Sequence, residues 1–330
     1  MNNNSSVNRR QFIRTAGSLA GAVTVMKAMD NFSLAALPGN RTIARRVLGR
    51  TKLEPTLMTL GAAPFGIADD VPIDEGVEIV NSALDLGINS IDTAPRYGKS
   101  LDVIGKALGN RRKEIILASK VWADTLKEAE ETLADSFKRL HTDYLDILYF
   151  HHLGDRNVDI ARKEDGVFTW LLKQKKAGKC RFVGISGHNL PMRFIPFIES
   201  GDVDVILVAL NFVDRFTYDF ENKVLPIAQK HNVGIVAMKV FGGPEGKSGS
   251  WGTRKALPMV GKENVALAIR YALSLPGVAT ANLGVHTADQ LRQNVEIVKN
   301  FKPLSEEEKQ KLLEKGKELA PQWGAHFGPA

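Results

Sequence analysis

Short apolar runs alternate with longer amphipathic stretches along the chain from about residue 57 onward. The apolar runs are brief and rich in branched side chains, which is typical of buried β-strands. The predicted strands cover residues 57–60, 90–92, 115–119, 145–150, 181–186, 203–210, 234–238 and 278–284.

The amphipathic stretches that follow these runs have the 3.6-residue periodicity of helices. Ala129, Leu133 and Phe137, for example, share one helix face, with charged residues on the other. Several stretches end in a glycine such as Gly109, a common helix stop. The predicted helices cover residues 73–85, 100–108, 126–140, 167–176, 192–199, 220–231, 264–274 and 288–298.

Eight strands that are each followed by a helix predict a single-domain (β/α)8 barrel. A doubly wound sheet is the alternative, but no G-x-G-x-x-G turn follows the first strand. We expect residues 45–53 to form a small hairpin at the bottom of the barrel and a charged helix to begin near Ser305. The barrel domain, with this C-terminal helical tail, is predicted to span residues 36–330.

The first 35 residues predict an export signal. Arg9 and Arg10, followed closely by Phe12, resemble the twin-arginine motif of bacteria. The weakly apolar stretch 15–26 is too short for a stable membrane span, and cleavage is expected after Ala35. We therefore expect contact with the twin-arginine export machinery and a periplasmic or exported location. If the signal does not function, as in a simple basic tail, the location would be cytoplasmic.

Charge and cysteine content argue against some classes of function and some kinds of site. The formal net charge is +7, and part of this excess lies in the N-terminal segment. The remaining basic residues are dispersed and form no stripe with interleaved aromatics, so we do not expect nucleic-acid binding. The single cysteine, Cys180, excludes an intrachain disulfide and a thiolate metal cluster.

Polar residues whose side chains could take part in catalysis follow three successive predicted strands. Asp92 and Tyr97 follow the second strand, Lys120 the third, and His151 the fourth. Because catalytic groups of a barrel stand at the carboxyl ends of its strands, these four side chains are expected to meet at one rim. No metal site is expected, because adjacent strand residues such as His151 and His152 should point to opposite faces.

The spacing of these residues resembles the catalytic motifs of the aldo-keto reductases. The resemblance rests on Asp92-x-x-x-x-Tyr97-Gly98, Ser119-Lys120-Val121-Trp122 and Asp146-x-x-x-x-His151, and it extends over about residues 46–300. It implies an NAD(P)H-dependent enzyme that reduces an aldehyde or a ketone, with a small carbonyl compound as its substrate.

The resemblance also implies the role of each residue. Tyr97 would donate the proton, Lys120 would bring the tyrosine pKa down toward neutral pH, and Asp92 would orient Lys120. His151 would hydrogen-bond the carbonyl oxygen. The substrate would lie against Trp122, Phe65 and His152.

The cofactor residues implied by the resemblance are altered in places. The expected set is Ser186, Asn211, Met238, Lys239, Phe241, Gly242, His286, Thr287, Gln290 and Asn294. Leu207 replaces a glutamine that often binds the carboxamide, Met238 replaces a stacking aromatic, and Gln290 stands where some members have arginine. NADP(H) is therefore favoured, and NAD(H) remains possible.

Two other functions remain open on the sequence alone. These changes on the cofactor side would suit a nicotinamide-binding accessory or regulatory protein with little turnover. A cofactor-free barrel lyase or isomerase is the third possibility.

Overall fold

The structure is a computed structural model that describes residues 42–244 and 252–330. The predicted export signal, residues 1–35 with Arg9 and Arg10, lies outside the described residues and stays a prediction. None of the helices in the described ranges has the length and apolar character needed to cross a membrane.

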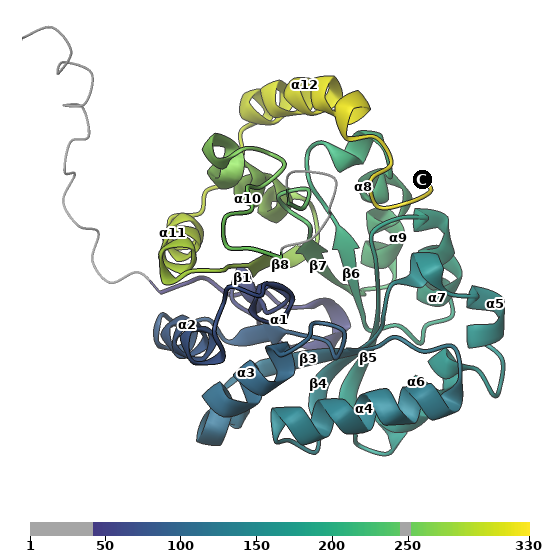
Figure 1. Cartoon of the computed structure of the whole chain (residues 1–330). Coiled ribbons are helices and arrows are strands. Elements are labelled where there is room, and N and C mark those ends of the chain that lie inside the picture. Colours follow the sequence, from purple (N-terminus) through teal and green to yellow (C-terminus); the bar gives the residue numbers. More distant parts are fainter. Residues whose placement is uncertain (1–41, 245–251) are drawn as a thin grey trace, which may run out of the picture. The chain divides into compact units, whose positions relative to one another are not determined.

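Eight parallel strands form a closed barrel in chain order, and the last strand pairs with the first (Figure 1). The barrel prediction is thus confirmed, and the doubly wound alternative is excluded because such a sheet stays open. The strands are β1 (Met58–Gly61), β2 (Ser90–Asp92), β3 (Ile116–Val121), β4 (Leu145–Phe150), β5 (Cys180–Gly187), β6 (Val205–Ala209), β7 (Gly234–Met238) and β8 (Val278–Gly284).

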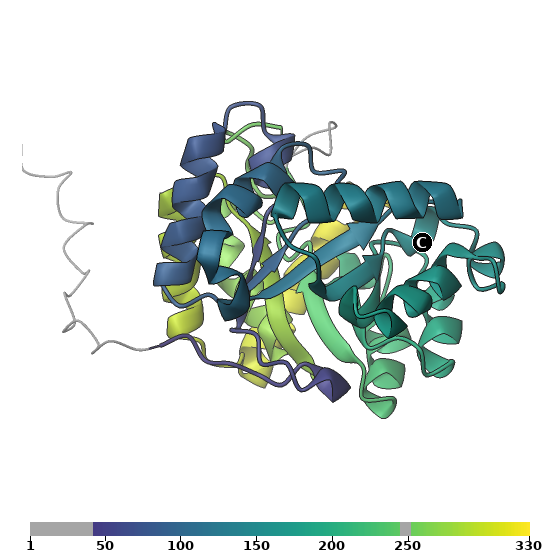
Figure 2. The ribbon, with the colours of Figure 1, turned by 90° about the horizontal axis from the view of Figure 1, so that it is seen from below.

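Helices surround the strands on the outside of the barrel, as the turned view also shows (Figure 2). Together with Figure 1, this view places the barrel strands inside a layer of helices. The helices are α1 (Pro64–Ile67), α2 (Ile73–Asp85), α3 (Ser100–Leu108), α4 (Leu126–Leu140), α5 (Val158–Ala161), α6 (Val167–Lys176), α7 (Ile195–Glu199), α8 (Phe220–Lys223), α9 (Leu225–Lys230), α10 (Val265–Ser274), α11 (Ala288–Lys299) and α12 (Glu306–Trp323).

Two helices that were predicted as continuous are divided in the structure. The stretch 192–199 is a 3₁₀ turn, η4 (Pro191–Phe194), followed by α7, and the stretch 220–231 is divided into α8 and α9. A proline stands near the start of each second piece, Pro196 in α7 and Pro226 in α9. Proline lacks the N–H that would continue the helical hydrogen bonds, so each division falls where a proline begins a new turn.

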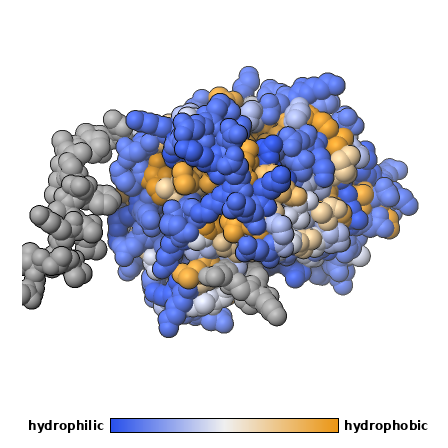
Figure 3. Space-filling model, turned by 90° about the horizontal axis from the view of Figure 1, so that it is seen from above, coloured by the Kyte–Doolittle hydropathy of each residue, from blue (hydrophilic) through white to orange (hydrophobic). Residues whose placement is uncertain are grey.

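Two layers of apolar side chains hold the barrel together. One layer fills the inside of the barrel and includes Leu48, Tyr149, Leu207 and Met238. The larger layer lies between the strands and the helices. The outer face seen in Figure 3 is mainly hydrophilic, with small apolar patches between the charged residues. Leu207, the residue that the resemblance aligns with a glutamine, packs inside the barrel.

The predicted hairpin at the bottom of the barrel is confirmed. Arg45 and Thr56 form an antiparallel bridge, and the Leu48 amide donates to the Leu53 carbonyl at 2.8 Å. The Arg50 amide donates to the carbonyl of Asn232, which precedes β7, at 2.7 Å. The hairpin therefore closes the amino-terminal end of the barrel, with Leu48 buried against the inner layer.

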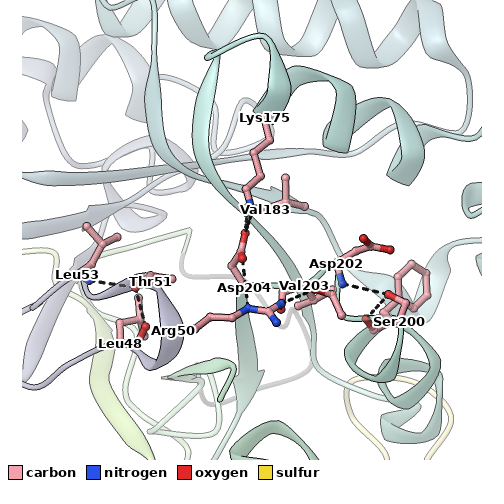
Figure 4. A network of polar contacts seen from close by, with 12 residues as sticks. Leu48, Arg50, Thr51, Leu53, Lys175, Val183, Ser200, Asp202, Val203 and Asp204 are labelled. Atoms are coloured by element: carbon pink, nitrogen blue, oxygen red, sulfur yellow. Dashed lines mark hydrogen bonds and ion pairs between the residues drawn. The ribbon is translucent and has the colours of Figure 1, made fainter. Parts of the chain in front are cut away.

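A buried carboxylate fastens this hairpin to the barrel wall (Figure 4). Asp204 accepts a hydrogen bond from the Val183 amide at 2.9 Å and from Lys175 Nζ at 2.5 Å. Its other oxygen lies 3.3 Å from Arg50 Nε. Because its side chain is only 9% exposed, this one carboxylate joins the hairpin, α6 and β5.

The chain ends in a tail that returns to the top of the barrel. After α12, the Phe327 amide donates to the hydroxyl of Tyr218 at 2.7 Å, and that hydroxyl donates to the Gly328 carbonyl at 3.1 Å. His326 Nε2 lies 2.8 Å from a carboxylate oxygen of Asp214. The tail is thereby fixed to the loop that follows β6.

Replacing Asp204 with alanine should destabilise the protein by about 2 kcal/mol, because the buried Val183 amide loses its acceptor. Arg50 and Lys175 are partly exposed, so water can solvate their freed charges. Asp202→Ala is the control, since this neighbouring residue is exposed, and its effect should stay within about 0.5 kcal/mol. Urea unfolding measures both values. Equal stability of the two variants would contradict the assigned role of Asp204.

Candidate active site

A cavity of about 360 Å³ opens at the carboxyl ends of the strands. It is lined by residues from β1, β2, β7 and β8 and from the segments just after β3, β4 and β5. Of the predicted site residues, the cavity brings together Asp92, Tyr97, Trp122, His151, His152, Met238, Lys239 and Phe241.

An ion pair lies at the base of this cavity. Lys120 Nζ is 2.5 Å from a carboxylate oxygen of Asp92 and donates to the Thr93 carbonyl at 2.9 Å. Asn282 of β8 donates to the same carboxylate oxygen at 3.1 Å. Burial alone would lower the pKa of Lys120, but attraction to Asp92 and Tyr97 outweighs it and raises that pKa. Lys120 is therefore a permanent cation at neutral pH.

Tyr97 is held on a tight turn beside this cation. Gly98 has a φ of +53°, and a Cβ added to Gly66 would lie 1.5 Å from the Tyr97 carbonyl oxygen. Glycine at both positions lets the loops after β1 and β2 touch backbone to backbone. The Lys120 ammonium lies 4.8 Å from the centre of the tyrosine ring.

Lys120 lowers the pKa of Tyr97 as expected, but burial outweighs this effect. We expected Lys120 to bring that pKa down toward neutral pH. Loss of solvation raises the pKa of Tyr97 above its usual value, and Lys120 offsets this only in part. The side chain is therefore a neutral phenol at neutral pH, the form that can donate a proton.

His151 lies beside Tyr97 as an uncharged ring. The two ring centres are 5.9 Å apart, and Trp122 packs edge-on against the other side of His151 at 5.4 Å. Burial, followed by repulsion from Lys120 and other cations, holds the pKa of His151 well below its usual range. A neutral imidazole can still donate one hydrogen bond, as the assigned role requires.

The expectation that His151 and His152 point to opposite faces is wrong. Strand β4 ends at Phe150, and His152 has a φ of +58°, so both rings line the same cavity. His188, which follows β5, packs against His152 at 4.8 Å. Burial lowers the pKa of His152 and of His188 as well. Within the described ranges, no group of three or more His, Cys, Asp or Glu residues is arranged to hold a metal ion.

Phe65 lies outside the predicted substrate wall. Its side chain is fully buried in the layer between strands and helices. Ala63, Pro64 and Ile67, its neighbours in the short helix α1, line the cavity instead. A one-turn helix turns successive side chains to different sides, so Phe65 faces the core.

Lys239 stands at the end of β7 and lines the cavity without an acidic hydrogen-bond partner among the described residues. Burial lowers its pKa to about 8. Its ammonium lies 5.4 Å from the ring centre of Phe327 in the C-terminal tail. Gly242, three residues on, has no room for a side chain because a Cβ there would meet Trp323 at 2.3 Å.

Two residues expected to bind the cofactor, Ser186 and Asn211, have hydrogen-bond partners within the protein. Ser186 is buried, and its hydroxyl accepts a hydrogen bond from the His152 amide at 3.2 Å. The Asn211 amide donates to Asp214 and to the Lys239 carbonyl, and its oxygen accepts from the amides of Val213 and Asp214. These four bonds use the full capacity of an asparagine side chain, so Asn211 fixes the loops after β6 and β7.

A second cavity of about 260 Å³ continues beyond β8. Phe241 and Gly284 line both cavities, so the two adjoin. His286, Gln290 and Asn294, which were expected to bind the cofactor, line the second cavity. Thr287 is not among the residues that line this cavity. Its hydroxyl caps α11 by accepting a hydrogen bond from the Gln290 amide.

Comparison with known proteins agrees with this geometry. The sequence profile of the aldo/keto reductase family matches residues 57–250, more than half of the chain. The chain belongs to the aldo/keto reductase family. It is an NAD(P)-dependent oxidoreductase of that family.

Similar proteins cover most of this reductase. The L-galactose dehydrogenase of Arabidopsis thaliana is 28% identical in an alignment 322 positions long that covers 86% of this chain and 98% of the plant protein. The solved holo form of the aldo-keto reductase AKR11C1 from Bacillus halodurans is 26% identical, with a TM-score of 0.66 over 83% of this chain and 96% of that one. A reductase from Klebsiella pneumoniae solved with NADP and acetate is 20% identical, with a TM-score of 0.67 over 87% of this chain and all of its own, and shows the shared fold.

The two adjoining cavities of the reductase fit an elongated dinucleotide. The first contains the Lys239 ammonium, suited to an anionic group, and the second ends at α11 beside Asn294. Lys262 is the one lysine or arginine among the described residues that line the second cavity, and no acidic residue is among them.

Some residues of the reductase site were not predicted from the sequence. Asn282 could have been identified from the sequence, because a side-chain amide within the apolar run of β8 needs a buried hydrogen-bond partner. His188 also directly follows a strand. Arg96 lines the first cavity from the turn before Tyr97, and Lys262 lines the second from a long loop. Neither of these two has a sequence pattern that distinguishes it from a surface cation.

Replacing Lys120 with methionine should destabilise the reductase by about 3 kcal/mol or more, because the buried Asp92 carboxylate loses its counter-ion. The double variant Lys120→Met with Asp92→Asn removes both charges, and we expect it to be more stable than the single variant. Urea unfolding of the three proteins gives the comparison. Additive losses in the double variant would show that the pair is not energetically coupled.

Proposed function

We propose that this protein reduces an aldehyde or a ketone to an alcohol with Tyr97 as the proton donor. The observation that carries the proposal is the junction of Tyr97, the Lys120–Asp92 ion pair and the neutral ring of His151 around one cavity. This arrangement supplies an acid, a fixed cation and a hydrogen-bond donor within one small volume.

A bound nicotinamide would supply the hydride that such a reduction requires. The protein side of the reaction follows from the residues. His151 donates a hydrogen bond to the carbonyl oxygen and stabilises the negative charge that develops there. Tyr97 gives that oxygen its phenolic proton, and the Lys120 ammonium stabilises the phenolate that remains.

Tyr97 carries its proton at neutral pH in the free enzyme, as a proton donor must. At neutral pH the phenol keeps its proton and can act as an acid. Oxidation of an alcohol would need the phenolate, which becomes abundant only above the usual tyrosine pKa of about 10.

We further propose NADP(H) as the preferred cofactor. Support comes from the relative solved with NADP and from Lys262 in the second cavity, a charged donor of the kind that a 2′-phosphate needs. His286 and Gln290 occupy the expected positions without a permanent charge, so NAD(H) can use the same cavity without that ion pair.

Tyr97→Phe should lower the reductase kcat by at least about 100-fold, because general acid catalysis is lost. A model aldehyde and NADPH, followed by the absorbance of the reduced nicotinamide, measure this loss. NADPH binding, followed by nucleotide fluorescence, should be unchanged in the variant. Equal turnover by wild type and variant would refute the mechanism. Nucleotide binding with negligible wild-type turnover would favour the accessory-protein alternative.

Lys262→Met should weaken NADPH binding by about tenfold, the equivalent of one charge-assisted hydrogen bond of about 1.5 kcal/mol. The affinity for NADH should not change. Lys255→Met is the control, because this exposed lysine lies in the same loop and does not line the cavity. Fluorescence titration of both nucleotides decides between the outcomes. Equal weakening for NADH would show that Lys262 does not contact the 2′-phosphate.

A further inference from the structure

Arg96 is an unpaired cation at the mouth of the first cavity. Its guanidinium carbon lies 4.3 Å from the ring centre of Trp122, and the residue is exposed. Within residues 42–244 and 252–330, its side chain makes no hydrogen bond and no ion pair. The aromatic contact therefore positions the guanidinium while its five N–H groups stay available.

A second arginine contacts the same ring and shows the contrast. The guanidinium carbon of Arg156 lies 4.5 Å from the Trp122 ring centre. Its NH1 lies 2.8 Å from a carboxylate oxygen of Asp124, and its side chain is 7% exposed. Arg156 is thus neutralised and enclosed. Arg96 is exposed and has no acidic partner in the part of the chain that the structure describes.

The rest of the cavity does not compensate the charge of Arg96. Asp92 is the only carboxylate among the described lining residues, and it already pairs with Lys120. The three histidines are kept neutral by burial. Lys239, which follows β7, also lines the cavity, and its ammonium lies 5.4 Å from the ring centre of Phe327 in the C-terminal tail. The side of the cavity formed by Arg96 and Trp122 therefore has an uncompensated positive charge, which could bind an anionic group.

The position of Arg96 suits a substrate rather than the dinucleotide. It follows β2, whereas the second cavity lies beyond β8. Trp122, on which Arg96 lies, contacts His151 at 5.4 Å between ring centres. A carbonyl compound bound at His151 and Tyr97 would thus reach the guanidinium with a group at its far end.

We propose that Arg96 binds the carboxylate of the substrate, so that the enzyme prefers aldehydes and ketones that also carry an acid group. A guanidinium and a carboxylate can form two parallel hydrogen bonds, which adds orientation to attraction. Arg96 then determines specificity: it anchors the remote end of the substrate while Tyr97 and His151 act on the carbonyl. This inference rests on the proposed reductase function.

The test compares two substrates that differ in charge and little in shape, 4-carboxybenzaldehyde and methyl 4-formylbenzoate. Wild type should have the higher kcat/KM for the acid. Arg96→Gln should lower kcat/KM for the acid by about tenfold or more, chiefly through KM, and should lower kcat/KM for the ester much less. Arg96→Lys should fall between the two, because it keeps the charge without the planar fork.

The matched control is Arg45→Gln, which removes the same charge from an exposed arginine at the opposite end of the barrel. It should leave both substrates unaffected. NADPH binding should be unchanged in every variant. Equal losses for acid and ester in Arg96→Gln, or no loss for either, would overturn the carboxylate site and leave the reductase function standing. If wild type reduces neither compound nor other aldehydes, the proposed function itself fails, and this inference fails with it.

Discussion

The site depends on one buried ion pair inside the rim of a closed barrel. Removing two charges from water is costly, and Lys120 and Asp92 meet that cost by their mutual contact and by bonds to Thr93 and Asn282. These bonds join β2, β3 and β8, which are separate in sequence. The barrel must therefore close before the pair is complete, and the positions of Tyr97 and His151 depend on that closure.

The electrostatic character of the cavity follows from burial and from this fixed cation. Burial is the main reason that the pKa values of His151, His152 and His188 are low, and the charge of Lys120 adds to the effect at His151 and His188. Burial also keeps Tyr97 a phenol, although Lys120 acts in the opposite direction on the pKa of this residue. Arg96 lines the cavity on one side and Lys239 on the other. The site therefore has neutral hydrogen-bond donors at its centre and cations at its two ends.

Much of the fold could be predicted from the sequence, because buried parallel strands are short apolar runs. Asp92, Tyr97, Lys120 and His151 were identifiable because strand ends converge in a barrel. The direction of the Tyr97 pKa shift could not be predicted, because it depends on how much water the folded site excludes. The full engagement of Asn211 and the turn at His152 likewise depend on backbone geometry. The helix divisions at Pro196 and Pro226 had a local signal, which the apolar periodicity masked.

The C-terminal tail links the shape of the first cavity to a local unfolding step that need not involve the barrel strands. His326 and Phe327 contact Asp214, Tyr218 and Lys239, and so complete the rim over β6 and β7. Release of these residues from the rim would remove the aromatic ring beside Lys239 and the imidazole beside Asp214 while the eight strands stay paired. Local unfolding of this short segment would therefore change the cavity without unfolding the barrel.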